Sequence, residues 1–386
     1  MTGRGSMDLP ESALDKVRST LRWLPTSVWQ RVVRRATRVR PIHLLIAVAD
    51  HFEPGILPDS PHLFASRDEQ EQRLERWCCE YPKMADRHRD VEGRPFRHTY
   101  FFPAEQYDAG LVSRLAEHCQ DGWGEIEIHL HHGHSAPDAS DNTRRTLVEF
   151  RERLVTHGCL SRLDGTGPPR YAFVHGNWAL ANSSDGRFCG VDDELEILAE
   201  TGCYGDFTLP SAPSPAQTRK INALYECTPP LARRAAHRHG SDLRVGSRVR
   251  QLPLIVQGPL LLAMRRDGSS LWRPYIENAA LTYNAPPTLA RLRLWQSAAV
   301  GVRGRPDWIF VKLHCHGMDP YDEPAMFGEP AQLFLRELLA LEDQVRTHFL
   351  TAREMVNVIF AACDGRDGDP GAYRDYRLGL IHPARR

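Results

Sequence analysis

The sequence predicts an α/β fold, and three observations lead to that class. Short apolar runs alternate with helix-like stretches from residue 41 onward. There are seven such runs, and this alternation is typical of a parallel sheet that closes into a barrel. Within the runs, apolar and polar residues alternate as in strands with two different faces. We therefore predict a (β/α) barrel of seven parallel strands over residues 41–386, preceded by a helical extension over residues 1–40.

The predicted extension is basic and amphipathic. Apolar residues recur in it at helical spacing, and arginines fill many of the other positions. Such a helix either makes peripheral contact with an anionic membrane surface or packs across the closed end of the barrel. Pro25 interrupts the apolar pattern, which favours packing. Because the first strand begins only near His43, we expect the barrel to fold without the extension.

The barrel elements follow one another in a regular order. The predicted strands are His43–Asp50, Arg97–Phe102, Glu125–His131, Tyr171–His175, Cys203–Phe207, Leu252–Gln257 and Trp308–His314. The predicted helices lie between them, at Glu69–Cys79, Ala109–Cys119, Thr143–His157, Asp192–Thr201, Pro287–Val300 and Pro330–His348. Turn-forming residues separate these elements, and we find no domain linker among them.

The composition excludes several classes of function. The chain carries 49 basic and 49 acidic side chains, so no net charge draws it onto nucleic acid. Its nine cysteines lack metal-finger spacing, and the N-terminus has no apolar signal region. The apolar stretches are too short or too interrupted to cross a bilayer. We therefore expect a reduced, cytoplasmic protein that does not bind nucleic acid.

Polar side chains are predicted to point into the barrel. In the run Glu125–His131, the isoleucines and the leucine share one face, and the glutamates and histidines share the other. The run from Trp308 to His316 likewise leaves Lys312 and His314 opposite its aliphatic residues. Polar groups inside a barrel are costly unless they bind something. This pattern indicates a site in the barrel.

Histidines gather where the predicted strands end. Eight of the 18 lie at or just past the carboxyl ends of strands, where barrel enzymes build their active sites; they are His51, His129, His131, His132, His134, His175, His314 and His316. Neutral imidazole is a usual ligand of zinc, and three protein ligands plus a water form a catalytic site. We therefore predict a divalent metal ion, with zinc as the first choice.

Two residues beside these histidines are suited to acid–base catalysis. Asp50 closes the first strand next to His51, where a carboxylate can accept a proton from a metal-bound water. His314 points inward from the last strand and can protonate a leaving group. The alternatives are a turn-capping aspartate before Pro54 and an ordinary core histidine.

The segment His175–Asn182 (HGNWALAN) is suited to contact a sugar. It places Trp178 beside Asn177, and an aromatic ring among amides can stack on a sugar ring or simply cover the edge of the core. The segment Thr208–Arg219 is rich in Pro and Ser and is expected to form a rigid loop over the barrel mouth. We expect His316, on the face of His314, to contact the substrate or a metal ligand.

Together these motifs resemble the polysaccharide deacetylase superfamily. The matching order is an apolar strand ending in Asp-His, then YFFPAEQYDAGLVSRLAEHC, then GEIEIHLHHGH, and a late strand ending in LHCHG. The match covers residues 43–134 well and residues 171–317 in outline. The resemblance implies a distorted (β/α) barrel, a bound metal ion and removal of an N- or O-acetyl group from a carbohydrate.

The resemblance also implies roles for single residues. Asp50 resembles the catalytic base, His129 the first metal-binding histidine and His314 the general acid. Asp206 loosely resembles an acidic residue that orients the general acid.

Three positions depart from the family pattern. His51 replaces a metal-binding aspartate, which makes the expected ligand set neutral and leaves the ion its full charge. Gly133 stands where a second histidine is expected, so that ligand shifts to His132 or His134. The Arg-x-Pro motif of the family is absent after the fourth strand. These departures are compatible with a different substrate or with loss of activity.

Two other functions fit the same residues. A phosphoesterase-like metal-dependent hydrolase would need further carboxylate ligands, such as Glu53 or Glu127, to hold a second ion. A catalytically inactive saccharide-binding protein of the same fold would need only the pocket. We expect the metal-dependent hydrolase that removes an acyl group from a carbohydrate.

Overall fold

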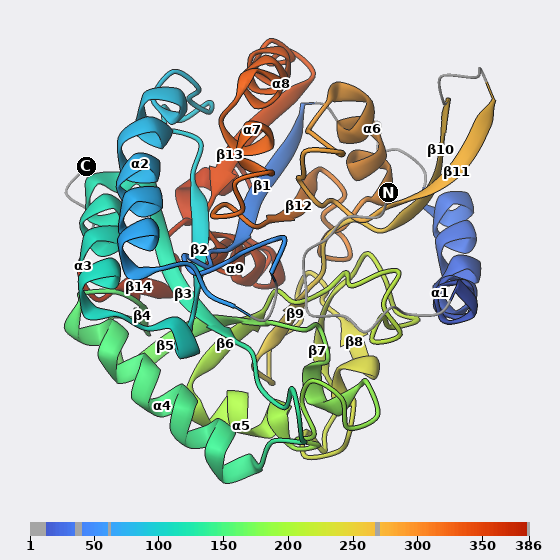
Figure 1. Cartoon of the computed structure of the whole chain (residues 1–386). Helices are drawn as coiled ribbons and strands as arrows, with labels where there is room; N and C mark the ends of the chain where they lie inside the picture. The colour runs from blue at the N-terminus through green and yellow to red at the C-terminus, as the bar shows by residue number, and fades with distance from the viewer. Residues whose placement is uncertain (1–12, 35–40, 61–62, 267–270, 384–386) are drawn as a thin grey trace.

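A mostly parallel β-sheet alternates with helices along the chain (Figure 1). The computed structural model describes residues 13–34, 41–60, 63–266 and 271–383. Parts of the predicted extension, residues 1–12 and 35–40, lie outside the described residues.

The seven predicted strands are neighbours in one sheet, and all six pairings between them are parallel. In sheet order they are β12 (Trp308–Cys315), β1 (Ile42–His51), β2 (His98–Pro103), β3 (Gly124–Leu130), β5 (Thr166–His175), β6 (Cys203–Asp206) and β9 (Leu254–Val256). This confirms the α/β class and the parallel strand order. The carboxyl ends of the seven strands therefore lie along one edge.

The sheet contains further strands that we did not predict. Past β9 it continues with β7 (Leu224–Cys227) and β8 (Gly240–Asp242), both antiparallel to their neighbours. In the described part of the chain, strand pairing does not join β8 to β12, so closure into a barrel stays a prediction. The other strands of this sheet are β4 (Ser161–Leu163), β13 (Val345–Leu350) and β14 (Leu378–Leu380), whereas β10 (Leu261–Arg266) and β11 (Trp272–Glu277) form a separate two-stranded sheet.

Six helices match the predicted positions with shifted ends. They are α2 (Arg67–Ala85), α3 (Ala109–His118), α4 (Ser140–Thr156), α5 (Glu194–Thr201), α6 (Leu289–Ala298) and α8 (Glu329–Leu339). The predicted helix Pro330–His348 was too long, because its last residues belong to β13, which pairs with β1. The sequence of β13, VRTHFL, contains β-branched Val345 and Thr347 and the aromatic Phe349, residue types that are common in strands. A short helix, α7 (Glu323–Met326), precedes α8.

The core has two layers, one on each face of the sheet. Leu44, Ile46 and Val48 of β1 pack in a cluster that includes side chains of α2 and α3. Their neighbours Leu45 and Ala47 pack in a second cluster with α9 (Ala352–Cys363), in which every residue is buried. Figure 1 shows α9 in the middle of the molecule. The predicted alternation is confirmed, and α9 occupies the face that we expected to form the barrel interior.

The extension contains one described helix, α1 (Ala13–Val33), which continues through Pro25. Trp23 is fully buried against Ile221 and Leu260, and the Gln30 side chain donates a 2.8 Å hydrogen bond to the Ile221 carbonyl. The helix therefore packs on the protein, beside β10 (Figure 1).

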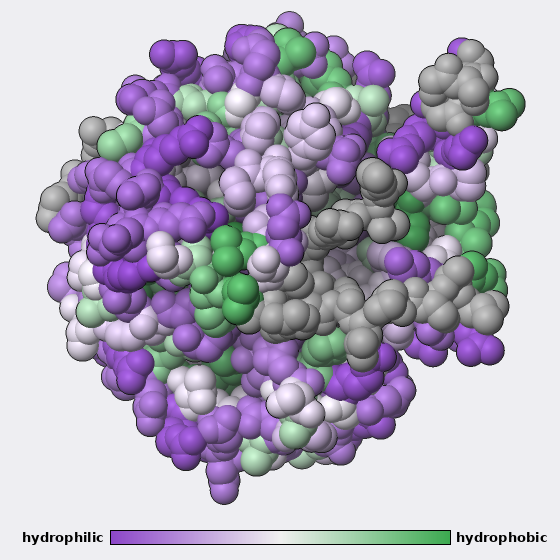
Figure 2. Space-filling view, in the orientation of Figure 1, coloured by the Kyte–Doolittle hydropathy of each residue, from purple (hydrophilic) through white to green (hydrophobic). Residues whose placement is uncertain are grey.

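The outer side of α1 carries apolar side chains together with the exposed Arg18, Arg22 and Arg31. Its exposed large hydrophobic residues are Val17, Leu21, Val28, Trp29, Val32 and Val33. Figure 2 shows hydrophobic side chains over α1 at the flank of the molecule. Among the described helices, none has the length and hydropathy needed to span a membrane.

Candidate metal centre

Three buried residues form the centre of the site. His51 is the last residue of β1, Glu53 follows it by two positions, and His129 lies near the end of β3. Each offers a ligand atom, and these atoms lie within 4.8 Å of one another. The ring centroids of His51 and His129 are 4.7 Å apart. The structure thus brings two predicted ligands together and adds a carboxylate to them.

The histidines meet at the Glu53 carboxylate. Its Oε1 lies 3.0 Å from Nε2 of His129 and 3.4 Å from Nε2 of His131. Its Oε2 lies 3.7 Å from Nδ1 of His316, whose ring centroid is 4.8 Å from that of His51. We call these five residues the central cluster.

The contacts of His129 leave a lone pair for an ion. Its Nδ1 lies 3.0 Å from the Val174 carbonyl oxygen, which can only accept, so Nδ1 carries the proton of the neutral ring. Nε2 and the Glu53 oxygen then face each other as two acceptors at 3.0 Å. Two ligand atoms that are each about 2.1 Å from one ion lie roughly 3.0–3.4 Å apart. This spacing fits a divalent ion, and Nδ1 atoms of His51 and His316 are buried without hydrogen-bond partners.

The protonation states of His51 and Glu53 also suit a metal ion. Burial, followed by the nearby His129, holds the pKa of His51 well below its ordinary value, so the ring is neutral at neutral pH. Burial would raise the pKa of Glu53, but the nearby His316 and His131 hold it well below its ordinary range. We expected a neutral ligand set; the ionised Glu53 instead offsets part of the charge of an ion.

One side of the central cluster is accessible. The His131 and His316 side chains are 16% and 17% exposed, whereas His129 is fully enclosed. Nδ1 of His131 lies 2.5 Å from Oε1 of Glu105, which holds the ring in place. A Cβ at position 176 would lie 2.2 Å from that ring, so Gly176 makes room for it. Catalytic metal sites keep such an open position, whereas structural sites are closed.

The other predicted ligands lie elsewhere. His134 is exposed and stacks on His131 with ring centroids 5.9 Å apart, outside the group of ligand atoms. The structure does not bring His132 together with His129; it buries His132 in a second group of ligating side chains with His175. Because side chains alternate along an extended chain, His131 rather than His132 follows His129 to the central cluster.

Asp50, the predicted base, lies on the other face of β1. Its Oδ1 accepts a 2.6 Å hydrogen bond from the Gly317 amide, and its Oδ2 lies 2.9 Å from Nδ1 of His98. Adjacent residues of a strand point to opposite faces, so Asp50 points away when His51 points into the cluster. The bond to Gly317 fixes the turn that carries His316.

His314 and Asp206 lie outside the central cluster. The ring centroid of His314 lies 6.5 Å from that of His51, and burial, reinforced by Lys312, holds the pKa of His314 well below its ordinary value. His314 is therefore neutral at neutral pH. The Asp206 carboxylate accepts a 2.7 Å hydrogen bond from the Thr208 hydroxyl, and burial raises its pKa to about 7.

The predicted sugar contacts differ in their accessibility. Trp178 is half-buried, with a left-handed backbone φ of 57°. Asn177 is buried, and its backbone amide donates to Nδ1 of His175 at 3.2 Å. Trp178 is thus the residue of this segment that is not fully buried.

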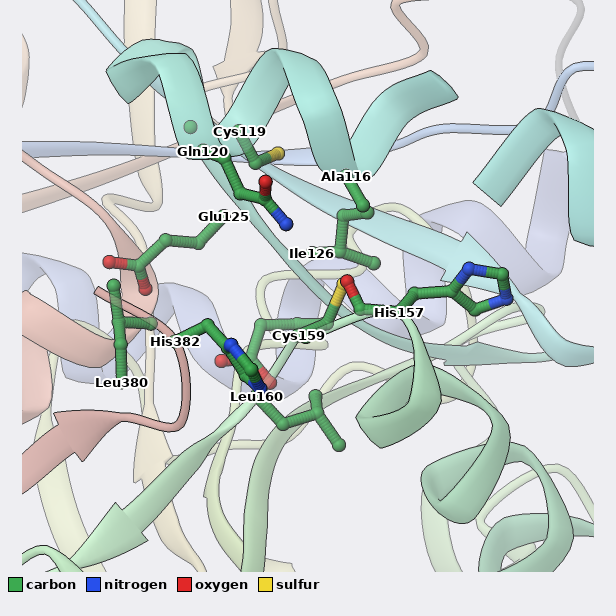
Figure 3. Close-up of a pocket in the computed structure, with 13 residues that line it drawn as sticks. Ala116, Cys119, Gln120, Glu125, Ile126, His157, Cys159, Leu160, Leu380 and His382 are labelled. Carbon is green, nitrogen blue, oxygen red and sulfur yellow. The ribbon is translucent and has the colours of Figure 1, made fainter. Parts of the chain in front are cut away.

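A small cavity lies at the far end of β3 from the central cluster (Figure 3). Its lining includes Glu125 at the start of β3, His157 just after α4, and His382. Its volume of about 30 Å³ has room for a water molecule and not for a sugar. The central cluster is therefore the better candidate for a substrate site.

Comparison with known proteins leaves the family open. Neither the protein-family models nor the curated protein sequences contain a match to this chain. The resemblance to the deacetylases thus stays a prediction that rests on the residues and their order.

Proposed function

We propose that the central cluster binds a divalent ion, with zinc as the first choice, and that the protein is a metal-dependent hydrolase acting on a carbohydrate. The observation that supports this most is the position of Glu53 between His129 and His131, at one edge of the sheet. Two histidines and one glutamate form one of the ligand sets of catalytic zinc. His51, Glu53 and His129 are such a set, with an accessible side next to them.

A bound ion at this place would polarise an acyl carbonyl and lower the pKa of a water. The residues on the accessible side would then accept and donate the protons of the reaction. His131, held by Glu105, is within reach as a general base, and His316, fixed through the turn at Gly317, is within reach as the acid. Trp178 is the candidate for stacking on a sugar ring. We propose acetyl removal because the order of motifs resembles the deacetylases.

The phosphoesterase alternative lacks support at Glu127. That carboxylate accepts hydrogen bonds from the Tyr204 hydroxyl at 2.5 Å and from the Ala172 amide at 2.6 Å. Burial raises the pKa of Glu127 well above its ordinary value, which disfavours the ionised form that a second ion would need. An inactive saccharide-binding protein would bind sugar and release no acetate.

The test is acetate release from N-acetylated and O-acetylated oligosaccharides by the full chain, with a phosphate ester as the competing substrate. We expect acetate release that stops with a chelator and returns with Zn²⁺. His129→Ala should reduce the rate by about a hundredfold or more, the scale of losing a catalytic group. His134→Ala is the matched control from the same run and should keep most of the rate. Phosphate release without acetate release would contradict the proposal.

A further inference from the structure

A second group of metal-ligating side chains lies apart from the central cluster. It consists of His132, just after β3; His175, the last residue of β5; Cys189; and Glu194, the first residue of α5. Their ligand atoms lie within 4.8 Å of one another, and all four residues are buried. Three separate segments of the chain therefore bring histidine, thiol and carboxylate groups to one enclosed point.

The distances in this group fit a tetrahedral ion. Nε2 of His175 lies 3.7 Å from Oε1 of Glu194, and Sγ of Cys189 lies 3.6 Å from its Oε2. Nitrogen, oxygen and sulfur ligands at about 2.0–2.3 Å from a tetrahedral ion lie roughly 3.3–3.7 Å apart. Nε2 of His132 is closer to the carboxylate, at 2.8 Å, which is a hydrogen-bond distance that lengthens when an ion replaces the proton.

The outer contacts of the ligands suit metal binding. Nδ1 of His132 lies 3.1 Å from Oδ2 of Asp138, which orients the ring with Nε2 toward the group. Metal-binding histidines commonly donate their other ring N–H to a carboxylate in this way. The Val191 amide donates to Sγ of Cys189 at 3.4 Å, and such a bond stabilises a thiolate. The Ala181 amide donates to Oε2 of Glu194 at 2.6 Å.

His175 supplies an independent sign of a missing ligand. Its Nε2 is buried, faces the group and has no hydrogen-bond partner. A buried polar atom without a partner costs about 1–3 kcal/mol, so such atoms usually bind something. To ligate through Nε2, the ring moves its proton to Nδ1 and gives up the 3.2 Å bond from the Asn177 amide.

Gly133 explains how the segments come together. Its φ is +65°, and a Cβ there would lie 2.2 Å from the Cys189 carbonyl oxygen. The Asp138 amide donates a 2.8 Å hydrogen bond to that same oxygen. Only glycine allows the histidine run to approach the Cys189 backbone so closely. The residue that departed from the deacetylase pattern is thus required for this second group.

We propose that His132, His175, Cys189 and Glu194 bind one structural Zn²⁺ ion. On binding, the Cys189 thiol releases its proton to solvent, the imidazoles coordinate as neutral rings, and lone pairs of the four side chains form the bonds to the ion without any change of oxidation state. The closed burial of the four ligands separates this site from the accessible central cluster. The proposal does not depend on the proposed hydrolase activity, because it concerns different residues.

The first test replaces zinc with Co²⁺ in the folded full chain and records the near-ultraviolet spectrum. A thiolate ligand produces an intense thiolate-to-Co²⁺ charge-transfer band, which we expect in the wild type. The band should be lost in Cys189→Ser and kept in Cys227→Ser, a matched buried cysteine outside the group. A Co²⁺-loaded wild type without this band would overturn the proposal, and this result needs no variant to fold.

The second test counts zinc ions per chain by elemental analysis. Cys189→Ser and His132→Ala should each bind one ion fewer than the wild type, whereas His134→Ala should bind the same number. His129→Ala should keep the Co²⁺ thiolate band, because it belongs to the central cluster. If the folded Cys189→Ser variant keeps the full zinc content, the site does not exist. If the band persists while acetate release is absent, only the proposed hydrolase function fails.

Discussion

At the scale of residues, Glu53 supplies the carboxylate around which the histidines of the central cluster are arranged. Its two oxygens lie within 3.7 Å of three imidazoles, and its charge makes a site that is attractive to a cation. The sequence contained a signal for this role, because Glu53 is two positions past His51 and therefore on the same side of an extended chain. We considered Glu53 only as a ligand for a second ion.

The same rule explains two other differences. Asp50 is adjacent to His51, and His132 is three positions from His129, so alternation places each on the opposite side from its predicted partner. A motif carried over from a family gives the order of the residues, but it does not by itself give the side of the strand to which each side chain points. The second group could not be predicted, because Cys189 and Glu194 reach His132 only through packing of distant loops.

The first residue-scale prediction compares His314→Ala with His316→Ala. We expected His314 to be the acid, but it is neutral and more buried than His316, which now favours His316. Both variants should keep their metal, and His316→Ala should lose about a hundredfold in turnover while His314→Ala loses much less. The rate of acetate release and the zinc content of each variant check this. A larger loss in His314→Ala would restore the original assignment.

At the scale of elements, the seven parallel strands were easier to predict than the helix that covers one face of their sheet. Each of the seven runs has a short apolar core bounded by turn residues, and this local pattern was enough. The helix α9 was not predicted, although Thr351 and Glu354 form a capping box at its start. We ended a helix at His348, inside β13, and so overlooked the helix that follows.

An ion-pair network holds α9 in place, and it predicts how stability depends on pH. Glu354 of α9 contacts Arg97 at 2.5 Å and Arg374 at 3.2 Å. Burial would raise the pKa of Glu354, but the coulombic effects of Arg97 and Arg374 outweigh it and lower the pKa to about 2. A depressed carboxyl pKa stabilises the folded state above the unfolded pKa, and this stabilisation is lost as the pH falls from about 4.5 to about 2.

The measurement is the free energy of unfolding in urea for the wild type and Glu354→Gln across this pH range. The difference between them should be largest near neutral pH and should shrink as the pH falls toward 2. The neighbouring Glu125 has a pKa that is raised first by burial and also by the charge of Glu354, so its pKa should fall in Glu354→Gln and offset part of the difference. A difference that stays constant with pH would contradict the role of Glu354.

At the scale of the whole molecule, the class of fold follows from local patterns, but barrel closure does not. Closure depends on contacts between the first and last strands of the sheet, which no local pattern specifies. The described sheet runs from β12 to β8, and one of its faces is covered by α9. The position of α1 beside β10 could not be predicted from local patterns either, because the residues that α1 contacts are about two hundred positions away in the sequence.

Removal of the extension tests how the molecule is divided. Trp23 belongs to a small cluster that is separate from the two main core clusters. A chain that starts at residue 38 should therefore keep its helical and strand content by circular dichroism and its zinc content. It should also lose any binding to anionic vesicles that the full chain shows, since the exposed apolar side chains of α1 are gone. Aggregation or loss of zinc would show that the extension is part of the folding unit.

The most direct test of the central claim is the zinc content of two neighbouring variants, Asp50→Asn and His51→Ala, measured against the wild type. The two residues are adjacent in the sequence and lie on opposite faces of β1. We predict that His51→Ala loses one ion per chain and that Asp50→Asn keeps the full number. Equal zinc content in the wild type and a folded His51→Ala variant, or loss of the ion in Asp50→Asn alone, would contradict the account.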